Sequence, residues 1–392
     1  MMRNFADRLE KIKKDGVYRS LKRSSVCGAD IEIDGARYAN FASNDYLGIS
    51  GRVDWQREFL ESVLNGGEKG FLMGSVSSRL LGCNSEAFFD FESFMAKEYS
   101  DISESPKSCL LFNCGYHANF GIIPALASSR DLILADKLSH ASIIDSLKLT
   151  EAKWLRYPHN DYEKLGEILS KKRGDFENVF IVSEAVFSMD GDFCDIEKLV
   201  EIKRKYGAFL YVDEAHSFGL FGEKGLGRCA ESGLLSDIDI VMCTLGKALA
   251  SEGAFAVCAP ETREMLINKC RTFIFSTALS PLSAKWSKFA AKKMFSMDSE
   301  RRRLADISSA FRNALKESLG DSQIVPAIVG GNEESLALSK AMLENGFYVP
   351  AIRHPTVPKN AARLRFSLSA AHSEESLERA AELFNRFAGR TL

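Results

Sequence analysis

The chain has 392 residues, with 51 lysines and arginines against 53 aspartates and glutamates, and nine cysteines. This length exceeds what one hydrophobic core usually serves, so we expect a large domain with a smaller companion. The balanced charge offers no basic stripe for nucleic acid, and no run reaches the roughly 20 apolar residues of a membrane span, so neither nucleic acid nor membrane is an expected partner. Cysteines without a Cys-x-x-Cys pair indicate reduced thiols and a cytoplasmic protein.

The first 52 residues are expected to form an amino-terminal arm and a hairpin. The opening residues have the spacing of an amphipathic helix and no apolar core typical of a signal peptide. Residues 31–48, IEIDGARYANFASNDYLG, alternate like two short strands around Asp34 and Gly35. An Asp-Gly pair between alternating segments predicts a tight hairpin turn.

Residues 53–280 repeat one unit, in which an apolar run of strand length is followed by a polar or glycine turn and an amphipathic helix. The runs are SCLLF (108–112), DLILAD (131–136), NVFIVSEA (178–185), AFLYVDEA (208–215) and IDIVMCTL (238–245). Each run is unbroken rather than alternating, as in strands covered on both faces, and helical connections imply a mostly parallel sheet. We therefore expect a large α/β domain.

The pattern changes at residue 281. A long helical stretch covers residues 283–320, and short strands are expected within SQIVPAIVG (322–330) and ARLRFSLS (362–369). A closing helix is predicted from Ser373. Residues 281–392 are therefore expected to form a smaller α+β domain.

Residues able to carry chemistry follow each of the five runs. In an open parallel sheet, ligands bind beyond the carboxyl ends of the strands, so these residues are expected to meet at one edge. In chain order they are the glycine turn at Gly115, then His140, then Glu184, then Asp213 with His216, and finally Thr244 with Lys247. Each alone has a simple structural explanation, such as a helix cap or a solvated lysine, but the coincidence of all five favours a site.

Two nucleotide-binding motifs are excluded by their spacing. A P-loop ending in the Gly-Lys pair would need a glycine at Val241 and a serine or threonine at Ala248. The DEAH sequence at 213–216 precedes that pair, whereas in a helicase it would follow it. A zinc site at Asp213 and His216 would normally require a second histidine cluster, so no metal is expected.

Pyridoxal 5'-phosphate (PLP) is a cofactor whose chemistry uses all five strand ends. PLP needs a lysine for a Schiff base, a carboxylate that keeps its pyridine nitrogen protonated, a phosphate cradle at a helix N-terminus and a flat partner for its ring. Lys247 can supply the amine and Asp213 the carboxylate. His140 can stack on the ring, and His216 can reach the ring hydroxyl. The expected phosphate cradle is Gly115 and Tyr116.

Over nearly its whole length the chain resembles the α-oxoamine synthases, which have the aspartate aminotransferase fold. The resemblance rests on FASNDYLG (41–48), GSVSSRLLG (74–82), LFNCGYHANFG (111–121), ILADKLSHAS (133–142), SEAVFSMDGD (183–192), VDEAHSFGLFGEKGLG (212–227) and TLGKALASEGA (244–254). It implies PLP as cofactor, a homodimer, and Lys247 as both the cofactor lysine and the general base. The catalytic residues it implies are Lys247, His140, Asp213 and His216. The cofactor-binding residues are these four with Gly115, Tyr116, Glu184, Ser188, Thr244, Ser276 and Thr277, of which Ser276 or Thr277 reaches the partner's cofactor.

Members of this family condense a small amino acid with an acyl-CoA and release carbon dioxide. The segment YVPAIRHPTVPKNAARLRFSLSAAH (348–372) resembles most the branch that serves biotin synthesis. This implies L-alanine and pimeloyl-CoA, or pimeloyl acyl-carrier protein, as substrates. Arg365 would clamp the alanine carboxylate with the help of Asn44. The substrate-binding residues implied are Arg19, Asn44, His140, Arg353, Thr356 and Arg365.

Alternatives remain within and outside this chemistry. The glycine-using aminoketobutyrate ligase and aminolevulinate synthase carry the same cofactor residues, and a catalytically silent binding protein would share the fold. Two positions depart from the family pattern: Phe88 lies where a histidine is expected, and Glu252 lies where relatives often carry a small or aromatic residue.

Overall fold

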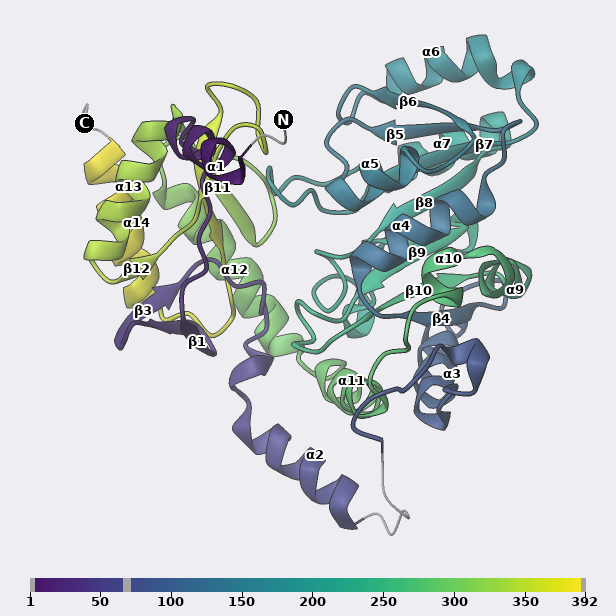
Figure 1. Ribbon diagram of the computed structural model, residues 1–392, viewed down its shortest axis with the longest axis horizontal. Coiled ribbons are helices and arrows are strands. Elements are labelled where there is room, and N and C mark those ends of the chain that lie inside the picture. Colours follow the sequence, from purple (N-terminus) through teal and green to yellow (C-terminus); the bar gives the residue numbers. More distant parts are fainter. Residues whose placement is uncertain (1–3, 66–71, 389–392) are drawn as a thin grey trace. The chain divides into compact units, whose positions relative to one another are not determined.

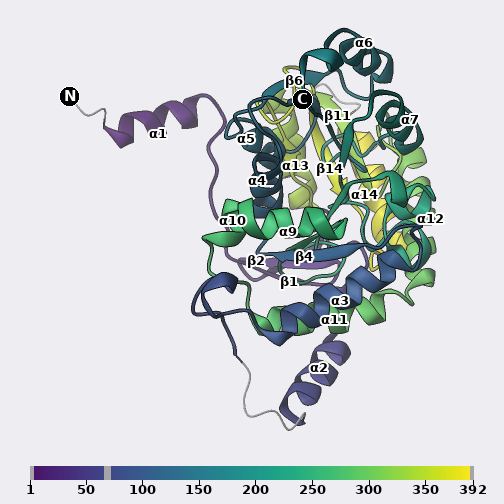
Figure 2. The same cartoon turned by 90° about the vertical axis from the view of Figure 1, so that its right-hand side faces the viewer.

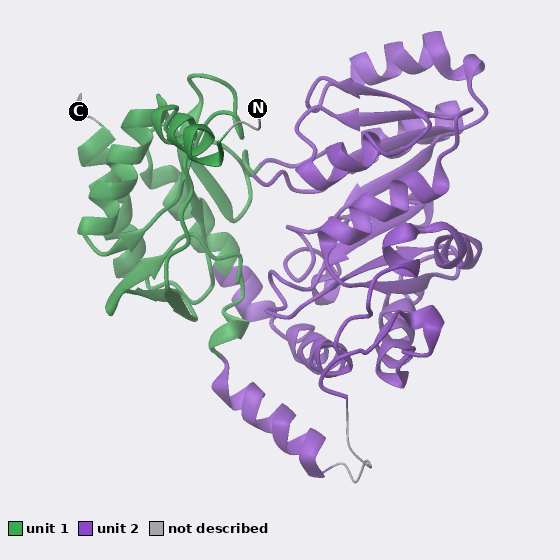
Figure 3. Cartoon of the chain, viewed as in Figure 1, with its two compact units in different colours: residues 1–51, 189–191, 304–392 green, residues 52–188, 192–303 purple. Residues whose placement is uncertain are grey.

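The computed structural model of the chain describes residues 4–65 and 72–388 (Figure 1). The described residues divide into two compact units, which are coloured separately in Figure 3. Unit 1 comprises residues 4–51, 189–191 and 304–388, and unit 2 comprises residues 52–65, 72–188 and 192–303. No helix in these ranges is long and apolar enough to cross a membrane.

The unit boundaries differ from the predicted domain boundaries at two places. The amino-terminal residues up to 51 cluster with the carboxyl-terminal residues rather than alone. Residues 281–303, which we expected in the small domain, cluster with unit 2 because α11 (Pro281–Met294) packs along α3 (Glu86–Ser100). A change of sequence texture at residue 281 therefore marks the start of a helix rather than the edge of a compact unit.

Unit 2 is built on a seven-stranded sheet with the order β4-β10-β9-β8-β7-β5-β6. Its strands are β4 (Ser108–Phe112), β5 (Leu132–Asp136), β6 (Lys153–Tyr157), β7 (Val179–Glu184), β8 (Phe209–Asp213), β9 (Ile240–Thr244) and β10 (Ala254–Cys258). β10 is antiparallel to β4 and β9, and the other pairs are parallel. The predicted mostly parallel α/β sheet is confirmed, and all five predicted runs form strands.

Two strands of this sheet lie outside the predicted runs. β6 is an edge strand in which Lys153, Trp154 and Arg156 are exposed, so it has no continuous apolar run. β10 is fully buried and apolar, but it follows Lys247 so closely that its first residue belongs to the TLGKALASEGA motif. β6 was not predicted because it lacks a continuous apolar run. β10 was not predicted because its first residue was read as part of the motif around Lys247.

Helices cover both faces of the sheet (Figure 2). On one face, α4 (Gly115–Leu126), α5 (Ala141–Leu147), α9 (Pro260–Lys269) and α10 (Arg271–Ile274) bury apolar side chains in a common core with the strands. On the other face, Phe91 of α3 contacts Phe255 of β10, with ring centroids 5.7 Å apart. The other helices of unit 2 are α2 (Val53–Asn65), α6 (Tyr162–Lys172), α7 (Ile196–Tyr206), α8 (Arg228–Glu231) and α11.

Helix α4 approaches α10 without any space for a side chain at Gly121. A Cβ atom at this position would lie 2.0 Å from Oγ1 of Thr272 and 2.6 Å from Sγ of Cys270. Glycine is therefore needed for the close packing of the helix whose first turn begins at Gly115.

Unit 1 contains two small sheets, with the orders β1-β2-β3-β12 and β11-β14-β13. Their strands are β1 (Ser24–Cys27), β2 (Asp30–Ile33), β3 (Ala36–Asn40), β11 (Ile324–Gly330), β12 (Phe347–Tyr348), β13 (Ala351–Ile352) and β14 (Ala362–Ser367). The helices are α1 (Phe5–Lys14), α13 (Asn332–Glu344), α14 (Glu374–Ala388) and the part of α12 (Asp298–Ala314) from residue 304. The predicted hairpin is confirmed, since Asp34 and Gly35 both have positive φ between β2 and β3.

An aromatic cluster holds unit 1 together. The ring of Phe41 stacks on His372 at 4.6 Å and meets Phe311 and Phe366 at 6.0 and 5.4 Å. Burial lowers the pKa of His372 to about 4, so its ring is neutral within this cluster.

Candidate active site

The predicted strand-end residues lie in unit 2, at the carboxyl edge of the sheet. Glu184 and Asp213 end β7 and β8 and are direct partners in the register. The next strand, β9, ends at Thr244, and Lys247 follows in the connection to β10. His140 follows β5, the strand on the other side of β7. The parallel order of these strands therefore brings the residues to one edge, as predicted.

Lys247 lies in a tight connection between two neighbouring strands. The backbone N–H of Leu245 donates to the carbonyl of Gly253 at 2.9 Å, which closes the connection at its base. Within it, Nζ of Lys247 lies 3.0 Å from Nε2 of His216. An ammonium only donates, so His216 accepts through Nε2 when Lys247 is protonated. The structure thus brings together an amine and an imidazole that sequence reasoning placed in one site.

Asp213 is buried and still has acceptor capacity. Its Oδ1 accepts from the backbone N–H of Ala215 at 2.8 Å, and its Oδ2 accepts from Nδ2 of Asn119 at 2.7 Å. An ionised carboxylate offers about four acceptor positions. The two protein donors therefore fix the carboxylate and leave lone pairs for a further cationic donor.

Glu184 holds the backbone that precedes α5. Its carboxyl group accepts a hydrogen bond from the backbone N–H of His140. Burial raises the pKa of Glu184 well above its usual range, and the neighbouring charge of Asp213 raises it further, against the opposing effects of the His140 N–H and Lys247. Burial therefore disfavours the charged form of Glu184.

His140 is the N-cap of α5, and its ring is held by Ser142. Nδ1 accepts from the backbone N–H of Ser142 at 3.2 Å and lies 2.7 Å from the Ser142 hydroxyl. Burial lowers the pKa of His140, and the positive charge of Lys247 lowers it too, whereas Asp213 acts in the opposite direction. The imidazole is therefore neutral at physiological pH.

The residues expected to form the phosphate cradle lie at the N-terminus of a helix. Helix α4 begins at Gly115, with Cys114 as its N-cap, so its first backbone N–H groups have no partner within the helix. Thr244 lies close by, since a Cβ atom at Gly115 would be 3.6 Å from Oγ1 of Thr244. Tyr116 is partly exposed and donates from its hydroxyl to Asp145 at 2.6 Å.

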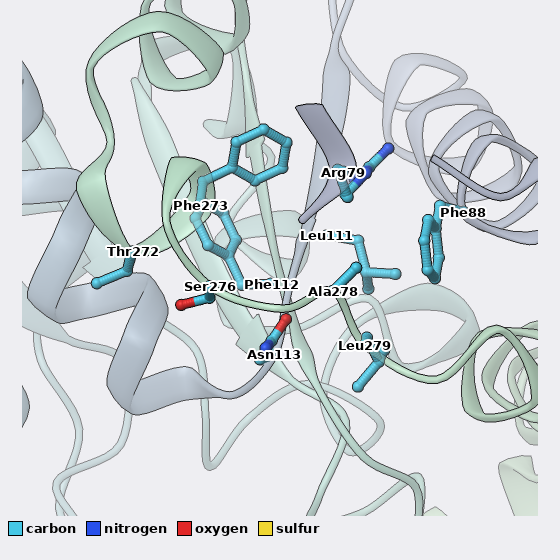
Figure 4. Close-up of a pocket in the computed structure, with 10 residues that line it drawn as sticks. All are labelled: Arg79, Phe88, Leu111, Phe112, Asn113, Thr272, Phe273, Ser276, Ala278 and Leu279. Atoms are coloured by element: carbon cyan, nitrogen blue, oxygen red, sulfur yellow. The ribbon is translucent and has the colours of Figure 1, made fainter. Parts of the chain in front are cut away.

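Ser276 and Thr277 lie beside the end of β4. The side chain of Asn113 donates to the carbonyl of Thr277 at 2.6 Å, which holds this segment against the strand. Asn113 and Ser276 also line a small pocket, together with the Arg79 side chain (Figure 4). Ser188 lies in unit 2, in the segment between β7 and α7.

The unexpected Phe88 lines the same pocket and has a structural partner (Figure 4). The Arg79 guanidinium lies 5.1 Å from the centroid of its ring, and Arg79 also forms a buried ion pair with Glu92. A phenyl ring can stabilise this buried cation through its face, which a charged imidazole could not do. Glu252, the other departure, accepts a hydrogen bond from the Ser283 hydroxyl at 3.1 Å.

Of the predicted substrate residues, His140 lies in unit 2 and the other five lie in unit 1. The guanidinium of Arg365, which is buried on β14, lies 3.4 Å from Oδ1 of Asn44 through both terminal nitrogens. Arg353 donates to the carbonyl of Gly16 and accepts, through its own carbonyl, from the backbone N–H of Thr356. Arg19 is exposed in the same unit. The pairing of Arg365 with Asn44 is a contact that the sequence resemblance implied.

Sequence reasoning missed the buried amide of Asn119. It lies in the quoted LFNCGYHANFG motif, four residues after Gly115, on a helix whose other buried side chains are apolar. One buried polar side chain on an apolar helix face requires a hydrogen-bond partner, and this was the signal that could have identified it.

Sequence reasoning also missed a histidine between two carboxylates. His159 follows β6, and its Nδ1 and Nε2 lie 2.9 Å from Asp136 and 2.7 Å from Asp192. Burial alone would lower its pKa, but the two carboxylates outweigh burial and raise the pKa to about 10. His159 is therefore an imidazolium that ties together the ends of two strands and the segment after β7.

Comparisons with known proteins agree with this geometry. The model of the aminotransferase class I and II family matches residues 36–384. An 8-amino-7-oxononanoate synthase of Chlorobaculum parvum is 43% identical over 375 residues, which cover 94% of each chain. The serine palmitoyltransferase of S. paucimobilis, solved with a bound PLP–myriocin aldimine, is 26% identical with a TM-score of 0.87 and covers 98% of this chain and 96% of its own. An 8-amino-7-oxononanoate synthase of Francisella tularensis is 28% identical with a TM-score of 0.70, over 89% of this chain and 97% of its own. The chain therefore belongs to the aminotransferase class I and II family, and these relatives confirm its resemblance to the α-oxoamine synthases.

Proposed function

We propose that the protein is a PLP-dependent acyltransferase that condenses L-alanine with a pimeloyl thioester, releases carbon dioxide and forms 8-amino-7-oxononanoate for biotin synthesis. The observation that carries this proposal is the set of Lys247, His216, Asp213 and His140 at one sheet edge, in a chain 43% identical to a synthase of that name. The acyl donor is either the coenzyme A thioester or the acyl-carrier-protein thioester.

The residues of the sheet edge fit PLP by their chemistry. The carboxylate of Asp213 keeps lone pairs for a protonated ring nitrogen, and the start of α4 at Gly115 offers free N–H groups for a phosphate. Bound PLP supplies an aldehyde for an amine and a cationic ring that takes up negative charge from the alanine Cα. We assign the further cofactor contacts to Tyr116, Glu184, Ser188, Thr244, Ser276 and Thr277.

The chain's own side chains then divide the remaining work. Nζ of Lys247 removes the proton at the alanine Cα and later returns one, with His216 placed 3.0 Å away as its hydrogen-bond partner. Asp213 keeps positive charge on the cofactor ring, and the neutral His140 covers the ring face. The alanine carboxylate is assigned to Arg365 and Asn44, and the acyl substrate is assigned to Arg19, Arg353 and Thr356.

A homodimer is part of the proposal, and exposed apolar side chains support it. Hydrogen bonds join residues 73–77 to residues 278–280. Met73 and Val76 in the first segment have exposed side chains, and so does Phe275, which precedes the second segment. Apolar residues gathered on a surface typically mark a protein interface. This surface adjoins Ser276 and Thr277, which are expected to complete the partner's site. Cytoplasmic location stays a prediction.

A coenzyme A release assay tests the function. Alanine, glycine and serine are each paired with pimeloyl-CoA, succinyl-CoA and acetyl-CoA, and the product is identified by mass. We expect pimeloyl-CoA with L-alanine to exceed acetyl-CoA with glycine by at least about 100-fold in kcat/KM, or about 2.7 kcal/mol. A preference for glycine would favour aminoketobutyrate ligase or aminolevulinate synthase, and no turnover with PLP bound would indicate a silent binding protein.

Two arginine variants separate the two substrate assignments. Arg353→Ala should weaken the preference for the long acyl chain more than it weakens alanine binding, whereas Arg365→Ala should do the reverse. Equal effects of both variants on both substrates would contradict the assignment.

A further inference from the structure

A chain of hydrogen bonds runs beneath the proposed cofactor residues, from Tyr211 through Asn119 to Asp213 and His140. The Tyr211 hydroxyl bonds to Oδ1 of Asn119, and Nδ2 of Asn119 lies 2.7 Å from Oδ2 of Asp213 and 2.9 Å from Oγ of Ser142. The Ser142 hydroxyl continues to Nδ1 of His140 at 2.7 Å. Asn119, Ser142, Tyr211 and Asp213 are all buried.

The directions of the hydrogen bonds in this chain follow from its two ends, the Asp213 carboxylate and Nδ1 of His140. An ionised carboxylate only accepts, so the amide nitrogen of Asn119 must face it. The second amide hydrogen is then available to the Ser142 oxygen, and the amide oxygen accepts from the Tyr211 hydroxyl. Because Nδ1 of His140 also accepts from a backbone N–H, it carries no proton, so the Ser142 hydroxyl donates its own hydrogen to this nitrogen. The backbone N–H of Ser142 donates to the same ring nitrogen.

We propose that Asn119 is a positioning residue that directs the Asp213 carboxylate and, through Ser142, fixes His140 as a neutral imidazole with its proton on Nε2. The inference rests on the proposed function and deepens it, because that function assigns Asp213 to the nitrogen of the cofactor ring and His140 to the face of the ring. The part that concerns His140 involves only the protein's own hydrogen bonds, so it can be tested without cofactor or turnover.

The charged groups around His140 act in both directions. Asp213 and Asp145 favour the imidazolium, whereas burial and the positive charge of Lys247 disfavour it. The two Ser142 donors stabilise a ring nitrogen that carries no proton. These donors therefore add to burial in keeping His140 neutral beside two carboxylates.

Nitrogen-15 NMR of the cofactor-free protein, labelled at histidine, observes the tautomer directly. The His140 signals are assigned by their loss in His140→Asn. We expect a bare Nδ1 and a protonated Nε2 at pH 7. A proton on Nδ1, or an imidazolium at pH 7, would overturn the proposal, and this result is read from the wild-type protein.

Two matched variants test the role of Asn119. Asn119→Asp keeps the shape but removes both N–H donors, so Ser142 turns its hydroxyl hydrogen to the new carboxylate, and the pKa of His140 should rise by about one unit or more. Asn178→Asp is the control: Asn178 makes the same kind of bond to a buried carboxylate, from its Nδ2 to Asp131 at 2.9 Å, at the opposite edge of the sheet. It should leave the His140 titration unchanged.

Ser142→Ala covers the case in which Asn119→Asp does not fold. Removal of the hydroxyl donor should also raise the pKa of His140, and in the double variant it should reduce the rise caused by Asn119→Asp. Asn119 has only a packing role if the pKa of His140 is the same in Asn119→Asp as in Asn178→Asp. Where Asn119→Asp does not fold, an unchanged His140 pKa in Ser142→Ala leads to the same conclusion.

The Asp213 branch is tested by exchange of the alanine Cα proton with solvent, without acyl donor. Asn119→Leu should lower this rate by about tenfold or more while the KM for alanine stays nearly constant. An unchanged rate would overturn this branch. Coenzyme A release by the wild type tests the proposed function separately, so normal NMR results without turnover would contradict only that function.

Discussion

Two carboxyl groups at the sheet edge have different hydrogen-bond partners although they lie close together. Asp213 and Glu184 are partners in adjacent strands, yet burial raises the pKa of Glu184, and Asp213 is held by two N–H donors. Donors that point at a carboxylate favour its ionised form. Asp213 is therefore suited to hold a positive charge, and Glu184 is suited to fix the backbone of His140.

Replacement of Asp213 tests that distinction. In Asp213→Asn we expect the protein to fold and to bind PLP at Lys247, while exchange of the alanine Cα proton falls by about 10²- to 10³-fold, since the ring nitrogen loses its anionic partner. Borohydride reduction and peptide mapping check the covalent attachment to Lys247, and deuterium exchange of alanine checks the rate. Asp131→Asn, at the opposite edge, is the control and should exchange normally. Wild-type exchange in Asp213→Asn would contradict the assigned role.

His159 makes stability depend on alkaline pH. Its pKa is raised from 6.5 to about 10, so its stabilising contribution is complete below pH 6.5 and is lost as the pH rises through about 10. His159→Gln should lower the free energy of unfolding by about 3 kcal/mol at pH 6, and the difference from wild type should shrink near pH 10. Urea unfolding at several pH values measures this. His354→Gln, at an exposed position, is the control, and a pH-independent difference for His159→Gln would argue against a charged His159.

The sequence indicated residues whose type the proposed cofactor chemistry requires. It did not indicate residues whose type depends on the side chains that surround them in the folded protein. The proposed cofactor chemistry accepts few residue types at these positions, so Lys247 and Asp213 stand out after apolar runs. Asn119 is an amide in a helix, and its partner Asp213 is 94 residues away. Its role depends on which side chain lies opposite, which no local pattern contains.

Helix α4 is constrained at two places, because its first turn begins at Gly115 and its Gly121 packs closely on α10. Gly121→Ala should destabilise the fold by about 1–3 kcal/mol, since the new Cβ atom would overlap the Thr272 side chain. Gly166→Ala, in α6, is the matched control, because its Cβ atom would meet nothing within 4 Å and should stabilise by about 0.5–1 kcal/mol. Urea unfolding measures both. Equal effects would show that α4 can move away from α10.

The strands that were predicted correctly have continuous apolar runs, which are typical of strands covered by helices on both faces. The five runs form β4, β5, β7, β8 and β9 within one or two residues of their expected ends. β6 was missed because an edge strand exposes most of its side chains to water, which leaves it without a continuous apolar run. The alternation around Asp34 and Gly35 predicted its hairpin because the turn chemistry is local.

At the scale of the whole molecule, the apolar surface next to Ser276 predicts a dimer that is required for activity. Val76 is 86% exposed, and Val76→Asp should shift the protein towards monomers and reduce coenzyme A release at low protein concentration. Analytical ultracentrifugation at the assay concentration measures the assembly. Leu149→Asp, at a 56% exposed apolar position elsewhere in unit 2, is the control. A fully active monomer would refute the dimer requirement.

The compact units end at other residues than the domains predicted from the sequence. The texture change at residue 281 was real, since α11 begins there, but a boundary depends on which surfaces the helix covers. Likewise, residues 4–51 cluster with residues 304–388 because β12 pairs with β3 in unit 1. Such long-range pairings leave no mark on composition.

The span of the Asn119 bond also bears on the order in which the molecule assembles. The Lys247 connection is closed by strands adjacent in the chain, through a bond between Leu245 and Gly253, whereas the bond from Asn119 to Asp213 joins residues 94 apart. Closing a longer loop costs more chain entropy and slows folding. During refolding, the loop that carries Lys247 should therefore form early and the buried amide contact late, so that Lys247 is in place before Asn119 holds the Asp213 carboxylate.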